Sequence, residues 1–207
     1  MFIPRHPVVE NQFCSYASVT SDTAAGGIGG VVAYAGSVVF LDSAATNQEP
    51  IVKKMSYTDR AGVPFGFLMQ KVKTGYHQVH PAGFYMPGDL GSSDVIAQPS
   101  YTGAGVINGT KAVPVGVAHL GIWDTVHYTT AGGAAAATAM LPGDSLYAAC
   151  DNAKVTNGTA GDGDADAAGE YCNSTVVARV VKGASAAKAS ANINNTTLYP
   201  IRIKLLI

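Results

Sequence analysis

The chain has 207 residues and a formal net charge of −1, and only 13% of its residues are charged, about half the share of an ordinary soluble domain. Its basic residues are scattered along the sequence, with no run longer than Lys53-Lys54. This argues against nucleic acid as a partner, because phosphate-binding proteins cluster lysine and arginine. No apolar stretch reaches the ~18 residues of a membrane span, and MFIPRHPVVE at the start lacks the pattern of a signal peptide, so we expect a protein that is made and kept in a cytoplasm.

The N-terminal segment is predicted to be extended chain. Pro4 and Pro7 fix φ and remove amide donors, and they stand among the apolar residues Phe2, Ile3 and Val8. Such a segment either packs along its own domain or lies on a neighbouring subunit and extends the sheet of that subunit.

The middle of the chain is a series of short strand patterns. Residues 51–59 alternate as a half-buried strand does, whereas 65–72 is apolar on both faces at its start, as a strand covered on both sides would be. The longest strand pattern is Val113–Thr130, in which Gly116 and Gly121 mark bulges or a bend.

The C-terminus closes on a clear amphipathic strand. One face is apolar and is made by Tyr199, Ile201, Ile203, Leu205 and Ile207. Arg202 and Lys204 face the other way. We therefore expect the C-terminus to be tied into a sheet.

Long loops rich in glycine and alanine separate the strands. They are predicted at 75–94, at 131–140 (where a short helical turn is the alternative), at 156–170 and at 184–195. No segment keeps a 3.6-residue period over three turns, so the chain is predicted to be all-β. Many short strands with glycine-rich turns are typical of a small barrel or a sandwich.

A pattern of glycine, strand, aspartate, loop, strand, lysine and glycine occurs twice. The first copy contains GSVVFLD (36–42) and FGFLMQKVKTG (65–75), and the second contains PGDSLYAACD (142–151) and VVARVVKG (176–183). We interpret it as a weak internal repeat of a small β unit, with chance as the alternative.

The chain divides into an arm and a β domain. Residues 1–30 are predicted to be an extended N-terminal arm that ends in the glycine-rich hinge 21–30. Residues 31–207 are predicted to be one β domain, or two related β units at about 31–85 and about 113–207 within it.

Candidate metal ligands form incomplete sets. Asp162, Asp164 and Asp166 alternate as in a calcium loop, but the glycine and glutamate that complete an EF-hand loop are missing. The histidines lie far apart or on opposite faces of extended chain: His77, His80, His119 and His127. We therefore expect no metal and no cofactor.

Catalytic motifs are absent from the sequence. There is no nucleophile elbow, phosphate-binding loop or dinucleotide fingerprint, and Gly26–Gly30 lacks the strand and helix that a phosphate loop needs. A Ser–His–Asp triad needs no sequence pattern, so only generic serines and histidines speak for an enzyme. We expect that the protein is not an enzyme.

The three cysteines are Cys14, Cys150 and Cys172. An odd number of cysteines without an export signal favours free thiols. A disulfide between Cys150 and Cys172, which flank one long loop, is the alternative.

Three parts of the sequence resemble the decoration, or cement, proteins of tailed-bacteriophage capsids. They are GSVVFLD (36–42) with PFGFLMQKV (64–72), PGDSLYAACDNAKVT (142–156) followed by VVARVVKG (176–183), and the terminal PIRIKLLI (200–207). The extended apolar N-terminus fits as well, because such proteins use arms to grip neighbours. The chain is longer than the simplest cement proteins, which leaves room for a duplicated barrel or an exposed lobe.

The resemblance implies a structural virion protein with a small β-barrel or β-tulip domain. It would bind the outside of the expanded head shell, bridge neighbouring capsomers and resist the pressure of packaged DNA. Its partners would be the major capsid protein and itself, as a homo-oligomer with a trimer favoured, on the virion surface and in the host cytoplasm during assembly. The arm is the predicted capsid contact, with residues Phe2, Ile3, Pro4, Arg5, His6, Pro7, Val8 and Val9.

Two other functions remain open. One is a head fibre or adhesin that binds host-surface glycans through aromatic loop residues, for which the candidates are Tyr76, Phe84, Tyr85 and Tyr101. The other is a major shell or tail-tube subunit, although a shell protein usually has a long helix. Trp123, the single tryptophan, is predicted to be a core residue or an anchor at a subunit contact.

Overall fold

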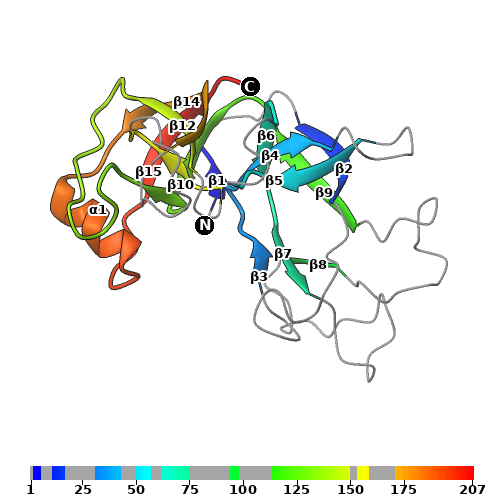
Figure 1. Cartoon of the computed structure of the whole chain (residues 1–207), viewed down its shortest axis with the longest axis horizontal. Coiled ribbons are helices and arrows are strands. Elements are labelled where there is room, and N and C mark those ends of the chain that lie inside the picture. The colour runs from blue at the N-terminus through cyan, green and yellow to red at the C-terminus, as the bar shows by residue number, and fades with distance from the viewer. Residues whose placement is uncertain are drawn as a thin grey trace.

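The computed structural model describes most of the predicted strands and few of the predicted loops. The described residues are 2–5, 11–16, 31–42, 50–56, 62–74, 94–97, 113–149, 153–158 and 171–207. Within them the regular structure is β-strand except for one helix, α1 (Ala186–Ile193), and no helix in these segments is long and apolar enough to cross a membrane (Figure 1). The predicted all-β class is therefore confirmed.

A seven-stranded sheet forms the left part of Figure 1. Its strands, in spatial order, are β1 (Phe2–Pro4), β10 (Ile122–Thr125), β15 (Ile201–Leu205), β14 (Tyr171–Lys182), β12 (Ser145–Ala149), β13 (Val155–Thr156) and β11 (Tyr128–Thr129). Neighbours are antiparallel except for β13 and β11, which are parallel. Because β15 has a partner on each side, the C-terminus is tied into the sheet, as predicted.

Five further strands close into a small barrel at the right of Figure 1. In spatial order they are β2 (Asn11–Tyr16), β5 (Ile51–Lys54), β4 (Val38–Leu41), β6 (Pro64–Leu68) and β9 (Val113–Ala118). A three-stranded sheet below the barrel consists of β3 (Val31–Ala33), β7 (Lys71–Thr74) and β8 (Asp94–Ala97).

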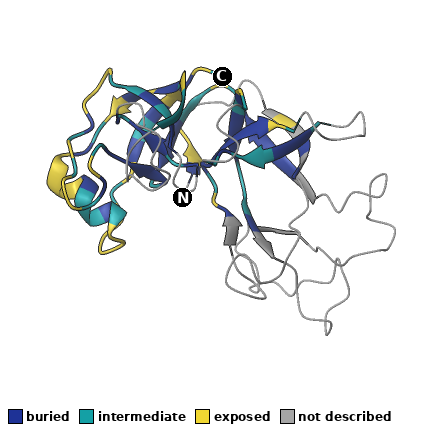
Figure 2. Ribbon diagram, viewed as in Figure 1, coloured by how far each residue is buried: buried dark blue, intermediate teal, exposed yellow. Residues whose placement is uncertain are grey.

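Strands β4 and β6 are buried on both faces and join the barrel to the seven-stranded sheet. Val38 and Phe67 belong to a core that also contains Trp123, whereas Val39 and Leu68 belong to the core of the barrel. Successive residues of a strand point to opposite faces, so each strand contributes to both cores, and Figure 2 shows both strands largely in dark blue. The predicted strand covered on both sides is therefore confirmed in β6.

The longest predicted strand is divided between the barrel and the seven-stranded sheet. Val113–Thr130 contains β9, which belongs to the barrel, and β10 and β11, which belong to the sheet. Gly121, between β9 and β10, has a φ of +118°, a conformation that glycine adopts without a steric penalty. The bend that was predicted at this glycine is confirmed, and it carries the chain from one sheet to the other.

The predicted loops have different outcomes. Residues 131–136 form turns, in agreement with the loop or helical turn predicted at 131–140. Most of the predicted loops at 75–94 and 156–170 lie outside the described residues.

The loop predicted at 184–195 is wrong, because this segment contains α1. Ser185 is extended and precedes a run rich in alanine, the residue with the highest helix propensity. Ala189 is fully buried, and the Nδ2 of Asn192 donates to the carbonyl of Val126 at 2.9 Å. These contacts stabilise a helix too short to be stable alone, while its first turn stays exposed (Figure 2).

Two parts of the predicted N-terminal arm are strands. In β1, Phe2 lies opposite Thr125, and β2 pairs with β9 in the barrel. Phe2 is buried, and its ring stacks on Trp123 with the two ring centroids 4.2 Å apart. Of the two arrangements predicted for the arm, these strands therefore adopt the first and pack along their own domain. Residues 6–10 and the hinge at 21–30 lie outside the described residues.

The two copies of the repeated sequence pattern begin with the same turn. In Tyr34–Ser37 and in Leu141–Asp144, the N–H of the fourth residue donates to the carbonyl of the first, at 3.0 and 3.1 Å. The side-chain oxygen of the fourth residue accepts the N–H of the first, at 3.2 and 2.8 Å. The third residue is glycine with a φ of +93° in one turn and +94° in the other, as a type II turn requires.

The strands that follow the two turns are also paired alike. The turn glycine donates to the carbonyl of Leu68 in the first copy and of Val180 in the second, both at 2.8 Å. The N–H groups of these two residues donate back to the fourth residue of the turn, at 2.9 and 3.0 Å. Strand β4 thus pairs with β6 as β12 pairs with β14, and both ladders contain a register shift.

The cysteines differ from one another. Cys172 is disulfide-bonded, so the prediction of free thiols is wrong for this residue. Cys14 is a free, buried thiol, and burial raises its pKa. Cys150 lies outside the described residues.

Candidate partner-binding surface

The register of the seven-stranded sheet gathers basic side chains on one face. Asp124 lies opposite Arg202, which in turn lies opposite Lys182. In the neighbouring row, Lys204 lies opposite Arg179. Side chains paired directly across antiparallel strands point to the same face, so all of these groups share one side of the sheet.

The other face of the same strands is core. Trp123, Ile203 and Val180 are neighbours across three strands, and all are buried. Because side chains alternate along each strand, the burial of this apolar row directs the charged residues between them to the opposite face.

Arg5 joins this charged face from the N-terminus. Its backbone N–H donates to the carbonyl of Ile122 at 2.8 Å and so extends the pairing of β1 with β10. We call the surface the cationic face, and its basic residues are Arg5, Arg179, Lys182, Arg202 and Lys204. Asp124 is the only acidic residue in the strands of this sheet.

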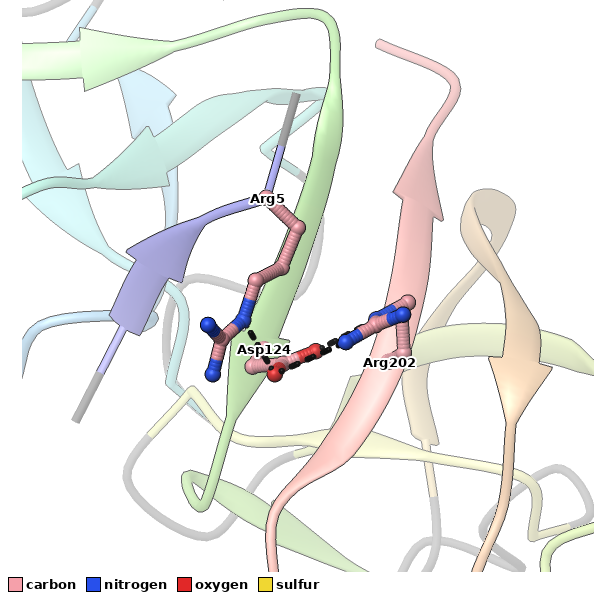
Figure 3. A network of polar contacts seen from close by, with 3 residues as sticks. All are labelled: Arg5, Asp124 and Arg202. Atoms are coloured by element: carbon pink, nitrogen blue, oxygen red, sulfur yellow. Dashed lines mark hydrogen bonds and ion pairs between the residues drawn. The ribbon is translucent and has the colours of Figure 1, made fainter.

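Two arginines bind Asp124 from opposite sides (Figure 3). The Nε of Arg202 donates to Oδ1 at 2.8 Å and its Nη2 to Oδ2 at 3.3 Å, while the Nε of Arg5 donates to Oδ2 at 2.5 Å. The carboxylate is 8% exposed, whereas the side chains of Arg5 and Arg202 are 44% and 34% exposed. In Figure 3 the terminal nitrogens of Arg5 point away from Asp124.

The charges of this cluster do not cancel. The hydrogen bond from Arg202 lowers the pKa of Asp124, and Arg5 lowers that pKa further, although burial opposes both effects. The bond to Asp124 in turn raises the pKa of Arg202. Asp124 is therefore ionised near neutral pH, and two arginine side chains share one carboxylate.

Exposed aliphatic side chains lie among the cations. Ile3, which pairs with Asp124, is 37% exposed, and Val181, at the register shift before Lys182, is 44% exposed. A surface that combines arginine with exposed apolar groups is typical of protein–protein interfaces. The arrangement can bind carboxylates and bury apolar surface at the same time.

The structure places the first residues of the predicted contact. Phe2 is in the core of its own domain, while Ile3, Pro4 and Arg5 are exposed. Ile3 and Arg5 lie on the cationic face. His6–Val9 lie outside the described residues, and contact with a capsid stays a prediction.

Sequence reasoning missed most of the cationic face. It placed Arg202 and Lys204 on one side of the last strand, but treated the basic residues as scattered. Arg179 and Lys182 join them only through the pairing of β14 with β15. Strict alternation would place Arg179 and Lys182 on opposite faces of β14. The register shift between Val180 and Lys182 brings them to the same face, so the local sequence contained no signal for it.

The aromatic residues proposed for glycan binding have no described neighbourhood. Tyr76, Phe84, Tyr85 and Tyr101 lie outside the described residues. Trp123 is 1% exposed and belongs to the core, so its predicted core role is confirmed.

The candidate metal ligands that the structure describes do not lie together. Within the described parts of the chain, no group of three or more histidine, cysteine, aspartate or glutamate residues could hold a metal ion. His119 packs edge-on against Phe65, and His127 interacts with Ser37. The other candidates, His77, His80, Asp162, Asp164 and Asp166, lie outside the described residues.

Comparison of the chain with models of protein families, with curated proteins and with solved structures gives no match. The function is therefore argued from the cationic face and from the resemblance in the sequence.

Proposed function

We propose that this chain is a structural virion protein that binds the outside of a phage head shell through the cationic face and bridges neighbouring capsomers. The observation that carries the proposal is the gathering of five basic side chains on one exposed sheet face, where two of them bind the carboxylate of Asp124. The resemblance to capsid decoration proteins provides the shell as the partner.

The chemistry of the face suits an acidic protein surface. Guanidinium groups bind carboxylates in a planar, bidentate manner, and Arg202 already binds Asp124 in this way. Burial of the exposed Ile3 and Val181 adds about 25 cal/mol per Å² of apolar area removed from water. Charge complementarity then sets orientation and association rate, and apolar burial adds affinity.

The proposed partners are the major capsid protein and further copies of this chain, with a trimer favoured. Each copy contributes contacts across the boundary between two capsomers, and these contacts resist the outward pressure of packaged DNA. The role is mechanical and involves no catalytic step, metal or cofactor.

The test is co-sedimentation of the purified chain with expanded, undecorated capsids. We expect saturable binding that raises the heat resistance of the shell. Replacing Lys204 by glutamate should weaken binding by about tenfold or more, because a like charge then faces the acidic partner. Lys188→Glu is the matched control, because Lys188 is exposed on α1, which is not part of the seven-stranded sheet.

The outcomes separate the possible partners. Equal losses of capsid affinity in Lys204→Glu and Lys188→Glu would show that the cationic face is not part of the interface. Absence of any binding to shells would overturn the capsid function. Tight binding of duplex DNA instead, lost in Lys204→Glu, would assign the face to nucleic acid, and selective binding on a glycan array would favour the adhesin.

A further inference from the structure

A cavity of about 630 Å³ lies between the barrel side and the sheet side of the molecule. Its walls come from β1, from the turn Tyr34–Ser37, from the segment that joins β10 to β11, and from the end of α1. This volume is in the range of sites that hold a small organic molecule.

The described charged side chains that line this cavity are basic. Lys71 and Lys154 line it together with His127, and none of its described lining residues is acidic. Both lysines also interact with other groups of the chain. An incoming anion would therefore share each lysine with a group that it already contacts. Burial raises the pKa of Tyr128, another lining residue, to about 12, so its phenol adds no negative charge.

Exposed apolar side chains are concentrated at the same cavity. Nine large apolar side chains are exposed in the described part of the chain, and three of them, Ile3, Tyr34 and Leu198, line this cavity with exposures of 37%, 46% and 61%. Large apolar groups left in water at a concave site are typical of ligand-binding surfaces. Phe2 and Met69 extend the apolar lining.

Hydrogen bonds hold the walls of the cavity in place. The hydroxyl of Tyr128 donates to the carbonyl of Tyr199 at 2.9 Å, and Nε2 of His127 lies 3.1 Å from Oγ of Ser37. The ring of His127 packs against Tyr34 with centroids 5.2 Å apart. A site that is formed before its ligand arrives loses less ordering entropy on binding.

We propose that this cavity binds a small organic anion with an apolar body, such as an aromatic or branched carboxylate or sulfonate. The acidic group would lie between Lys71 and Lys154, and the apolar body would contact Tyr34, Leu198 and Ile3. The site borders the cationic face, because Ile3 belongs to both, but Arg5, Asp124 and Arg202 do not line the cavity.

The test uses a pair of probes that differ in one charge. The full chain is titrated with 1-anilinonaphthalene-8-sulfonate and with its uncharged counterpart N-phenyl-1-naphthylamine, and fluorescence is recorded. We expect the sulfonate to bind at least about tenfold more tightly than the neutral probe, with an affinity that falls as salt is added. The double variant Lys71→Gln/Lys154→Gln should lose that preference but still bind the neutral probe.

The control variant is Lys182→Gln/Lys204→Gln, which removes the same number of charges from the cationic face. It should keep the affinity of the wild type for the sulfonate. Cooperative thermal unfolding of each variant establishes that the probe reports on a folded chain. Equal affinity of the wild type for both probes, or an unchanged sulfonate affinity in Lys71→Gln/Lys154→Gln, would overturn the proposal. Shell co-sedimentation of the two double variants separates this site from the capsid function.

Discussion

The turns Tyr34–Ser37 and Leu141–Asp144 have the same backbone and different surroundings. A Cβ added to Gly36 would lie 3.0 Å from Oγ1 of Thr125 and 3.3 Å from the ring of Phe2, whereas one added to Gly143 would meet nothing within 4 Å. The first turn is therefore packed where the barrel meets the sheet, and the second is open to solvent. Local sequence sets the turn, and the packing around it decides how much a change there costs.

The fourth residue of each turn matches these surroundings. Ser37 is fully buried and also contacts His127, whereas Asp144 is half-buried and also accepts a bond from Asn157. A neutral hydroxyl can be buried with one or two hydrogen bonds, but a carboxylate in the same place would lose its hydration. The same capping role is thus carried out by different residues in the two regions.

The largest effect is expected for Phe2→Ala, because Phe2 covers the first turn and has no counterpart at the second. The ring is 8% exposed and stacks between Trp123 and Phe67, with centroids 4.2 and 5.9 Å away. Its removal leaves a cavity and should lower the free energy of unfolding by about 3–5 kcal/mol, measured by urea denaturation. Ile3→Ala, on the exposed side of the same strand, should cost less than about 1 kcal/mol.

This result also bears on how the N-terminus is tested for capsid binding. Deletion of the first residues would remove Phe2 and β1 together, so lost binding could reflect lost folding. A Phe2→Ala chain as stable as the wild type would show that β1 is not part of the fold in solution, and the deletion would then be informative.

The direct comparison of the two turns is Gly36→Ala against Gly143→Ala. Both changes force alanine into a positive φ, which costs about 1 kcal/mol. Gly36→Ala also overpacks the contact with Thr125 and Phe2, so its total cost should be about 3 kcal/mol. Thermal or urea unfolding of both variants measures the difference, and equal costs would mean that the first turn is as open as the second.

The sheet and the barrel also differ in how they hold an acidic group. Asp124 has two arginine partners, whereas Asp42 in the barrel pairs with Lys53 at 2.8 Å. Asp124→Asn should cost about 1–3 kcal/mol at pH 7, because its carboxylate is 8% exposed and binds two arginines. Asp42→Asn should cost less than about 1 kcal/mol, because its carboxylate is more exposed, at 15%, and its ion pair with Lys53 lies nearer the solvent. Similar losses for the two variants would contradict this difference.

The pH dependence of Asp124 has a defined sign. Its pKa is lowered in the folded state, so its contribution to stability is present above the ordinary carboxyl pKa of about 4 and is lost as the pH falls through the lowered value. The gap in unfolding free energy between wild type and Asp124→Asn should therefore narrow below pH 4. A gap that stays constant down to pH 2 would show that the ion pairs do not stabilise the fold.

The smallest difference in stability cost between the two turns is expected for the capping side chains, Ser37 and Asp144. Ser37→Ala removes the acceptor for Tyr34 N–H inside the core and should cost about 1–2 kcal/mol. Asp144→Ala removes the acceptor for Leu141 N–H at the surface, where water replaces it, and should cost about 0.5–1 kcal/mol. Chemical denaturation resolves the pair, and a larger loss for Asp144→Ala would reverse the assignment of buried and open turns.

The sequence by itself determined the local features of this protein. Alternation predicted the last strand and its outward Arg202 and Lys204, and glycine marked the bend at Gly121. A repeated pattern indicated two related β units, and both copies begin with the same turn. These features depend on residues a few positions apart, for which side-chain periodicity and allowed φ values are sufficient.

Only the tertiary structure decided which of these elements meet. The ion pair of Arg5 with Asp124 joins residues 119 positions apart, and the cationic face exists because β15 lies between β10 and β14. The sequence did not predict α1, because the helix is stabilised by the tertiary contacts of Ala189 and Asn192 and not by an amphipathic pattern of its own. Strand order and register are set by the burial of apolar faces across the whole chain, and a local pattern contains no information about the partner that covers it.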